Sequence, residues 1–114
     1  MNVRKGIIEM HEVLYFLTLC EEGTFTRAAK RCDVSQPSLT NAIKSLESKL
    51  GGKLFNRGKK PLFKTRLTEL GELVKPHMRR ISREAARACQ VGQKYAVKKS
   101  AVNVVGNNSA EMPI

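Results

Sequence analysis

The chain has 114 residues, with 21 Lys and Arg against 10 Asp and Glu, a formal net charge of +11 and a pI near 10.0. This length predicts one domain with an appended element, and the charge favours a polyanionic partner, nucleic acid first and an anionic membrane surface second. No apolar run reaches the ~20 residues that a membrane-spanning helix needs, and the N-terminal residues lack the apolar segment of a signal peptide.

The first predicted helix lies in the segment 7–23. Its apolar residues recur at helical spacing and are Met10, Val13, Leu14, Leu17 and Cys20. We expect this stripe to face the core. Gly23 should end the helix, because glycine adopts the left-handed conformation of a helix C-terminus without strain.

A short helix and a longer one follow. Thr24 can cap the first and Ser35 the second with a side-chain oxygen, while Asp33 in the turn tolerates a left-handed conformation. Pro37 lies in a first helical turn, where a missing N–H costs little, and Gly51 ends the longer helix. The residues expected to point inward are Phe25, Ala28, Ala29, Cys32, Leu39, Ala42, Ile43, Leu46 and Leu50.

The longer of these two helices also carries a polar stripe. Two helices joined by a turn of about four residues, the second capped and polar on one face, describe a helix-turn-helix. A polar stripe alone is usually a solvated face, but the major groove admits a helix, and one amide side chain can donate to a base and accept from it. The candidates for base reading are Gln36, Pro37, Thr40 and Asn41.

Phosphate contacts would fix the register of that helix without reading sequence. Helix N-termini and basic side chains suit this role, and the candidates are Thr24, Thr26, Arg27, Ser35, Ser38, Lys44, Arg57, Lys59 and Lys60. The last three belong to the segment 53–66, which contains six basic residues and no acid. Its apolar residues flank a Gly-Lys-Lys-Pro turn, so we expect a short two-stranded β wing there.

A long helical pattern begins at Thr68, with Glu69 and Glu72 near its positive end. Its apolar stripe consists of Leu70, Leu73, Val74, His77, Met78, Ile81, Ala85 and Ala88. A helix as far as Gln90 would be ~35 Å long at ~1.5 Å per residue, too long to fold back on a small domain. We therefore expect the stripe to form a homodimer interface, with a kink at Pro76.

These elements predict a mainly α protein: a winged helix-turn-helix, with a three-helix head and a two-stranded β wing, followed by a long dimerisation helix. We expect the DNA-binding domain to occupy residues 1–67 and the linker or dimerisation helix residues 68–95. Residues 96–114 form a tail in which only the segment 101–105 has the pattern of a strand.

The stretch "FLTLCEEGTFTRAAKRCDVSQPSLTNAIKSLESKLGGKLFNR", followed by "LTELG", resembles the DNA-binding region of LysR-type transcriptional regulators. The resemblance covers roughly residues 10–89. It implies a winged helix-turn-helix, a linker helix that pairs in an antiparallel dimer, and binding to partly palindromic promoter DNA. The positions that match the family's DNA-contacting residues are Thr24, Arg27, Gln36, Pro37, Thr40, Asn41 and Arg57. Asn41 stands where many members carry Arg, and the wing is a few residues longer than usual.

The family's C-terminal effector-binding domain has no counterpart in this sequence. We expect the chain to be a fragment, with the tail as the truncated start of that domain. On this interpretation the chain binds no small-molecule effector, and a tetramer is possible only with the missing domain.

Two other classes of function fit the sequence less well. An enzyme would need convergent acid, base or nucleophilic residues, whereas the acids here lie mostly on helix surfaces and no glycine loop cradles a phosphate, so we expect no catalysis. The alternative is a sequence-neutral basic protein that binds nucleic acid. Such a protein should show aromatic platforms, but the two Tyr and four Phe fall largely at apolar-pattern positions.

Metal and cysteine chemistry find little support in the sequence. The three cysteines fit neither a disulfide framework nor a zinc site, which favours a reduced, cytoplasmic protein. Cys20 and Cys32 lie on apolar stripes and are expected to be small core residues. His11 and His77 lack spaced ligand partners, so we expect no metal and no other cofactor.

Overall fold

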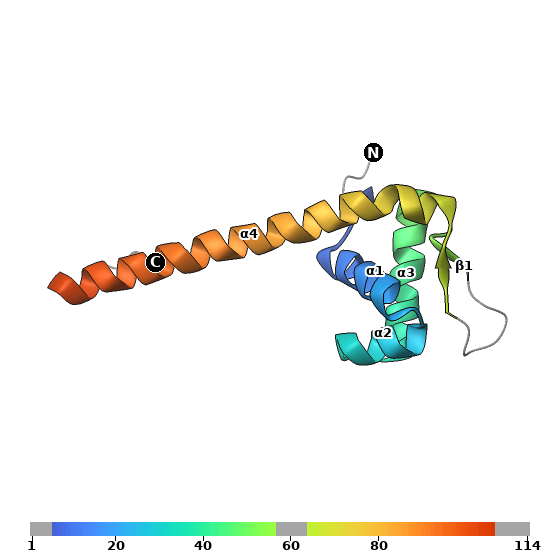
Figure 1. Cartoon of the computed structure of the whole chain (residues 1–114), viewed down its shortest axis with the longest axis horizontal. Helices are drawn as coiled ribbons and strands as arrows, with labels where there is room; N and C mark the ends of the chain where they lie inside the picture. The colour runs from blue at the N-terminus through green and yellow to red at the C-terminus, as the bar shows by residue number, and fades with distance from the viewer. Residues whose placement is uncertain (1–5, 57–63, 107–114) are drawn as a thin grey trace. The chain divides into compact units, whose positions relative to one another are not determined.

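A computed structural model of the chain describes residues 6–56 and 64–106. The elements follow in the order α1 (Met10–Glu22), α2 (Phe25–Cys32), α3 (Gln36–Leu50), β1 (Phe55–Asn56), β2 (Arg66–Leu67) and α4 (Glu69–Gly106). The chain divides into two units, residues 1–82, here called the head, and residues 83–114. Within the head, α1, α2 and α3 pack against one another (Figure 1). The mainly α, winged helix-turn-helix fold is confirmed.

The helices α2 and α3 begin and end where the sequence predicted, and α1 ends at the predicted Gly23. The Thr24 hydroxyl accepts the Arg27 N–H at 3.1 Å, and the Ser35 hydroxyl accepts the N–H of the residue three positions later at 3.2 Å. At the C-termini Gly23 and Gly51 have φ of 85° and 87°. These side-chain caps and left-handed glycines satisfy backbone groups that a helix leaves unpaired at its ends.

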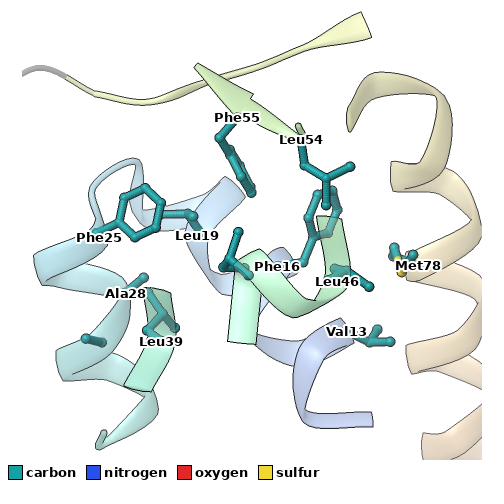
Figure 2. Close-up of a cluster of buried hydrophobic side chains, with 12 residues drawn as sticks. Val13, Phe16, Leu19, Phe25, Ala28, Leu39, Leu46, Leu54, Phe55 and Met78 are labelled. Atoms are coloured by element: carbon teal, nitrogen blue, oxygen red, sulfur yellow. The ribbon is translucent and has the colours of Figure 1, made fainter. Parts of the chain in front are cut away.

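The core of the head lies between the three helices, the segment entering β1 and the first turns of α4. Figure 2 shows Leu54 and Phe55 lying over side chains from α1, α2 and α3. The Phe55 ring packs at 5.3 Å from the Phe16 ring and 6.4 Å from the Phe25 ring, between centroids. The buried cluster is Val13, Phe16, Leu19, Phe25, Ala28, Ala29, Leu39, Ile43, Leu46, Leu54, Phe55 and Met78.

The buried face of α1 differs from the predicted one. Of the five residues expected to face the core only Val13 is buried, and Leu14 is 45% exposed. Phe16 and Leu19, outside the expected stripe, are fully buried. Apolar residues of α1 occupy most of its circumference, so the helical period fits two different apolar stripes. Contact with α2 and α3 decides which stripe is buried.

The wing is a two-stranded antiparallel sheet, as predicted, with Phe55 opposite Leu67 and Asn56 opposite Arg66. Just before β2, the Thr65 N–H donates to the Gly23 carbonyl at 2.7 Å, which ties the wing to the α1–α2 junction. The turn residues expected between the strands, 57–63, lie outside the described residues.

The helix α4 continues to Gly106, so the strand predicted at 101–105 is wrong. The helix is also uninterrupted at Pro76, and the kink there stays a prediction. Once a helix has formed, each further residue adds a hydrogen bond, and no proline follows Pro76 before Pro113. The strand preference of a few valines is too weak to overcome this propagation.

The first turns of α4 pack on the head's own core. Met78 is 2% exposed and lies beside Leu46 and Val13 (Figure 2), so its expected place in a dimer interface is wrong. Leu70 and Val74 are partly buried against the same core. Helical periodicity marks an apolar face but does not distinguish an intramolecular contact from an intermolecular one.

Gly71 permits a close approach between α4 and the segment that enters β1. A Cβ atom at Gly71 would collide with the carbonyl oxygen of Leu54 and lie 2.7 Å from Cδ2 of Leu67. The nearby Thr68 N–H donates to the same Leu54 oxygen at 2.9 Å, which fixes that carbonyl in place. Because the obstacle is backbone, it cannot move aside as a flexible side chain would.

One carboxylate, Glu12, is buried inside the head, at 2% exposure. Its oxygens accept hydrogen bonds from the Ser45 hydroxyl at 2.8 Å, Lys49 Nζ at 2.9 and 3.0 Å, and the Glu9 N–H at 2.8 Å. Burial raises the pKa of Glu12, but these hydrogen bonds together outweigh burial, so the pKa is lowered from its ordinary value. This contact joins the start of α1 to the second half of α3, and no sequence pattern pointed to it.

The glycine contact predicts opposite effects of one substitution at two positions of α4. Gly71→Ala should destabilise the head by about 1–3 kcal/mol or more, as overpacking against a rigid neighbour does. Gly92→Ala is the matched control, since nothing lies within 4 Å of its Cβ position. The control should leave the head unchanged and favour the helix by up to about 1 kcal/mol. Urea unfolding of both variants measures this, and a wild-type midpoint for Gly71→Ala would contradict the close approach.

The buried carboxylate predicts a pH-dependent stability. Glu12→Gln should destabilise the head at pH 7 by on the order of 3 kcal/mol, the lower end for breaking a buried pair, since Lys49 is 15% exposed and reaches water. Because the folded pKa is lowered, the carboxylate's contribution is complete above its unfolded pKa and is lost as pH falls through the folded value. The gap between wild type and variant should therefore shrink in acid.

Glu84→Gln serves as the control for this comparison, because Glu84 and Arg87 form an exposed ion pair at 3.4 Å. Exposed pairs contribute under about 1 kcal/mol. Denaturation midpoints at pH 7, 5 and 3 measure both variants. A pH-independent gap for Glu12→Gln would show that the carboxylate's charge has no part in stability.

Candidate nucleic-acid interface

The predicted base-reading residues share the uncovered face of α3. Gln36, Pro37 and Asn41 are exposed, and Thr40 is half-buried. The opposite face of the same helix lies in the core, with Leu39 and Leu46 fully buried. Burial on one side therefore holds the helix, and polar groups are left free to contact a partner on the other.

One predicted base-reading residue is already hydrogen-bonded to a residue expected to contact phosphate. The Thr26 hydroxyl donates to Oε1 of Gln36 at 3.1 Å, and both side chains are exposed. This bond links the first turn of α2 to the first residue of α3 across the turn of the helix-turn-helix. The structure thus brings together two residues to which the sequence assigned separate roles.

The N-terminus of α3 is organised by two serines that the sequence placed on the DNA backbone. Ser35 accepts the Ser38 N–H, and its own hydroxyl donates to Ser38 Oγ at 2.9 Å. Both serines remain exposed. The positive end of the helix dipole favours an anion at this point.

The arginines of α2 lie among acidic residues of α1. Arg31 pairs with Glu21 at 2.6 Å and with Glu22 at 3.0 Å, and its hydrogen bond holds the pKa of Glu22 below the usual value. Arg27, a predicted phosphate contact, is 70% exposed on its side chain and only 3.4 Å from Glu22. Because the Arg27 side chain is largely exposed, this ion pair is weak.

A hollow of ≈ 320 Å³ separates α3 from the wing. It places Lys44 and Lys53 on one surface with Thr40, beside Asn56 of β1. The sequence singled out Thr40 and Lys44 individually, and Lys53 only as part of a basic segment. Asn56 was missed, and its position one residue before Arg57 was the signal available. The hollow is lined by Phe25, Thr40, Ile43, Lys44, Glu47, Lys53, Phe55 and Asn56.

The basic side chains of the wing are described only in part. Lys64 and Arg66 are exposed at β2. Arg57, Lys59 and Lys60, all predicted phosphate contacts, lie outside the described residues. Lys64 and Arg66 therefore add positive charge on the β2 side of the wing, and Lys53 adds it before β1.

The remaining candidate chemistry is sparse. In residues 6–56 and 64–106 no three His, Cys, Asp or Glu side chains come together as metal ligands, and no helix there is long and apolar enough to cross a membrane. Burial raises the pKa of Cys20 to about 11, which keeps this thiol protonated near neutral pH. Cys20 and Cys32 pack against the core, whereas Cys89 is exposed.

The residues of the apolar stripe predicted for dimerisation differ in exposure. Within the head, Leu73, His77 and Ile81 remain exposed, while Met78 belongs to the core. In the second unit Ala85 is half-buried and Ala88 exposed. Further exposed apolar residues follow on the second unit, namely Val91, Tyr95 and Val97.

A protein-family model described as "Bacterial regulatory helix-turn-helix protein, lysR family" matches residues 10–72, more than half of the chain. The "SDS degradation transcriptional activation protein" of Pseudomonas sp. is 38% identical over 64% of this chain and 23% of its own length. The "HTH-type transcriptional regulator AlsR" of Bacillus subtilis is 30% identical over 87% of this chain and 32% of its own. The chain thus spans a third or less of these relatives.

Solved structures resemble the chain over a similar extent. A CbnR_DBD–DNA complex has a TM-score of 0.69 and 33% identity, covering 77% of this chain and 98% of that one. A BenM_DBD complex with catB site 1 DNA also has a TM-score of 0.69, at 27% identity, covering 77% of this chain and 96% of that one. Together with the winged helix-turn-helix head and the polar face of α3, these matches establish that the chain belongs to the LysR family of bacterial regulatory helix-turn-helix proteins.

Proposed function

We propose that the chain binds double-stranded promoter DNA sequence-specifically by placing α3 in the major groove. The observation that carries the proposal is the division of α3 into a buried face and an exposed face on which the amides of Gln36 and Asn41 stand beside Lys44. A groove ≈ 12 Å wide admits one helix, and amide groups match the donor and acceptor patterns of base edges. A surface selected only for charge would carry lysines and arginines there instead.

The related structures support this proposal. The CbnR and BenM domains named above are in complex with DNA, and both resemble this chain over most of their own length. We propose that Gln36 and Asn41 read bases, that Thr40 contacts a base or a phosphate, and that Pro37 offers an apolar contact to a thymine methyl group. The phosphate contacts proposed are Thr24, Arg27, Ser35, Ser38, Lys44, Arg57, Lys59 and Lys60.

We also propose that two copies pair through α4, so that two heads bind the two halves of a partly palindromic site. The residues available for that contact are the exposed Leu73, His77 and Ile81, followed by Ala85 and Ala88. Leu70 and Val74 can contribute only at their uncovered edges. The protein would act in the cytoplasm as part of a transcriptional regulator and would catalyse no reaction itself.

Loss of a base-reading residue and loss of a phosphate contact in α3 should weaken DNA binding in different ways. Asn41→Ala should cost about 1–3 kcal/mol at the preferred site and relax base choice at one position per half-site. The salt dependence of DNA binding by Asn41→Ala should barely differ from that of the wild type. Lys44→Ala should weaken binding to every duplex about equally and flatten the log–log salt slope by about 1.

Both variants would be titrated against a duplex selected from a random pool and a mixed-sequence duplex, at two stated salt concentrations. If Asn41→Ala weakened both duplexes alike, Asn41 would be a backbone contact. If the wild type bound the selected and mixed duplexes equally, the alternative of a sequence-neutral basic protein would replace this proposal.

Dimerisation through α4 predicts that Ile81→Asp shifts the protein from dimer to monomer, because an unpaired charge in an apolar interface is costly. Ile81 is 39% exposed, so the head should stay folded. Gln90→Asp introduces the same charge at an exposed polar position of the helix and should leave the dimer intact. Sedimentation equilibrium measures the mass. An unchanged dimer mass for Ile81→Asp would place the interface elsewhere.

A further inference from the structure

We propose that Thr26 is a positioning residue that fixes which end of the Gln36 amide faces the DNA, so that Gln36 reads a hydrogen-bond acceptor on a base. This inference rests on the proposed function, and it replaces the phosphate contact expected for Thr26 from the sequence. The geometry that carries it is the 3.1 Å hydrogen bond from the Thr26 hydroxyl to Oε1 of Gln36.

The bond orients the amide because its two ends differ chemically. The carbonyl oxygen of glutamine only accepts hydrogen bonds, and its NH2 group only donates them. With Oε1 held by Thr26, the NH2 group is the end left to contact a partner. The two residues lie in different helices, each positioned by its own side-chain cap, Thr24 for α2 and Ser35 for α3. Ala28 of α2 and Leu39 of α3 belong to one buried cluster, so the core sets the separation of the two helices.

The same bond argues against a phosphate contact from this hydroxyl. A threonine hydroxyl has one hydrogen, and phosphate oxygens accept hydrogen bonds without donating. Donation to Gln36 and donation to a phosphate therefore exclude each other. The exposed Arg27, next along α2, has donors to spare and suits phosphate better.

An amide fixed in this way has a definite base preference. In the major groove guanine presents O6 and N7, adenine N7, and thymine O4 as acceptors, whereas cytosine presents only its N4 amino donor. An outward NH2 group can donate a hydrogen bond to guanine, adenine or thymine, but it meets another donor at cytosine. Gln36 should accordingly disfavour cytosine at the base position that it contacts.

The bond also reduces the cost of ordering Gln36 on binding. A free glutamine side chain occupies many rotamers, and ordering them opposes association. Thr26 limits these rotamers before DNA arrives. Exclusion of water from the groove then strengthens the bond, because the competing solvent is removed.

The test uses the full chain and a duplex selected by it from a random pool. Gln36→Ala first identifies the base position that Gln36 contacts, as the position where base choice relaxes. Affinities are then measured with each of the four base pairs there, at one salt concentration. The wild type should bind the cytosine duplex about tenfold more weakly than the best one, a difference of about 1.4 kcal/mol.

Two substitutions of similar size separate positioning from other roles. Thr26→Val removes the hydroxyl, so the amide can rotate, and discrimination against cytosine should fall to roughly twofold to threefold with no change in the melting temperature. Thr26→Ser keeps the hydroxyl and should retain the wild-type preference. Since Thr26 is exposed, neither change should affect folding.

Each remaining outcome is decisive. Equal weakening of all four duplexes by Thr26→Val, with base preference retained, would make Thr26 a phosphate contact and overturn the inference. A wild-type preference for cytosine at this position would mean that Oε1 faces the base, and would overturn it as well. Failure of the wild type to select any site would instead refute the proposed function, and with it the premise of this inference.

Discussion

The buried contact of Glu12 with Lys49 and Ser45 is the interaction on which the placement of α3 depends. A carboxylate removed from water is tolerated only when its oxygens are hydrogen-bonded, and here they accept from two side chains and a backbone N–H. Apolar packing decides which faces of α1 and α3 meet, and side chains of both helices lie in one buried cluster. The charged pair penalises movement of α3 along α1, because any slip would leave an unpaired charge in the head.

Backbone contacts attach the wing and α4 to the three packed helices α1, α2 and α3. Gly71 lets α4 come against the Leu54 carbonyl, Thr68 donates to the same oxygen, and Thr65 donates to Gly23 at the end of α1. Backbone hydrogen bonds and close approaches leave less freedom than side-chain contacts do. As a result β1 and the polar face of α3 lie on either side of one hollow, with Lys44 and Lys53 both lining it.

Some features of the candidate site follow from local sequence patterns, and others depend on how the helices pack. The exposure of Gln36, Pro37 and Asn41 could be predicted, because a cap, a helical period and an apolar stripe together leave one face uncovered. The bond from Thr26 to Gln36 could not be predicted, since it depends on the crossing of two helices. Asn56 was missed for the same reason, because its neighbours in the hollow come from α3.

The sequence by itself determined the start and end of α2 and α3, the end of α1, the turn between α2 and α3, and the presence of a two-stranded wing. These features depend on caps, left-handed positions and periodicity, all of which act within a few residues. Only the tertiary structure decided that α1 buries Phe16 rather than Leu14, and that Met78 packs inside the head. It also decided that Glu12 meets Lys49. Those outcomes depend on which surfaces meet, and an amphipathic pattern shows that a face will be covered without showing what covers it.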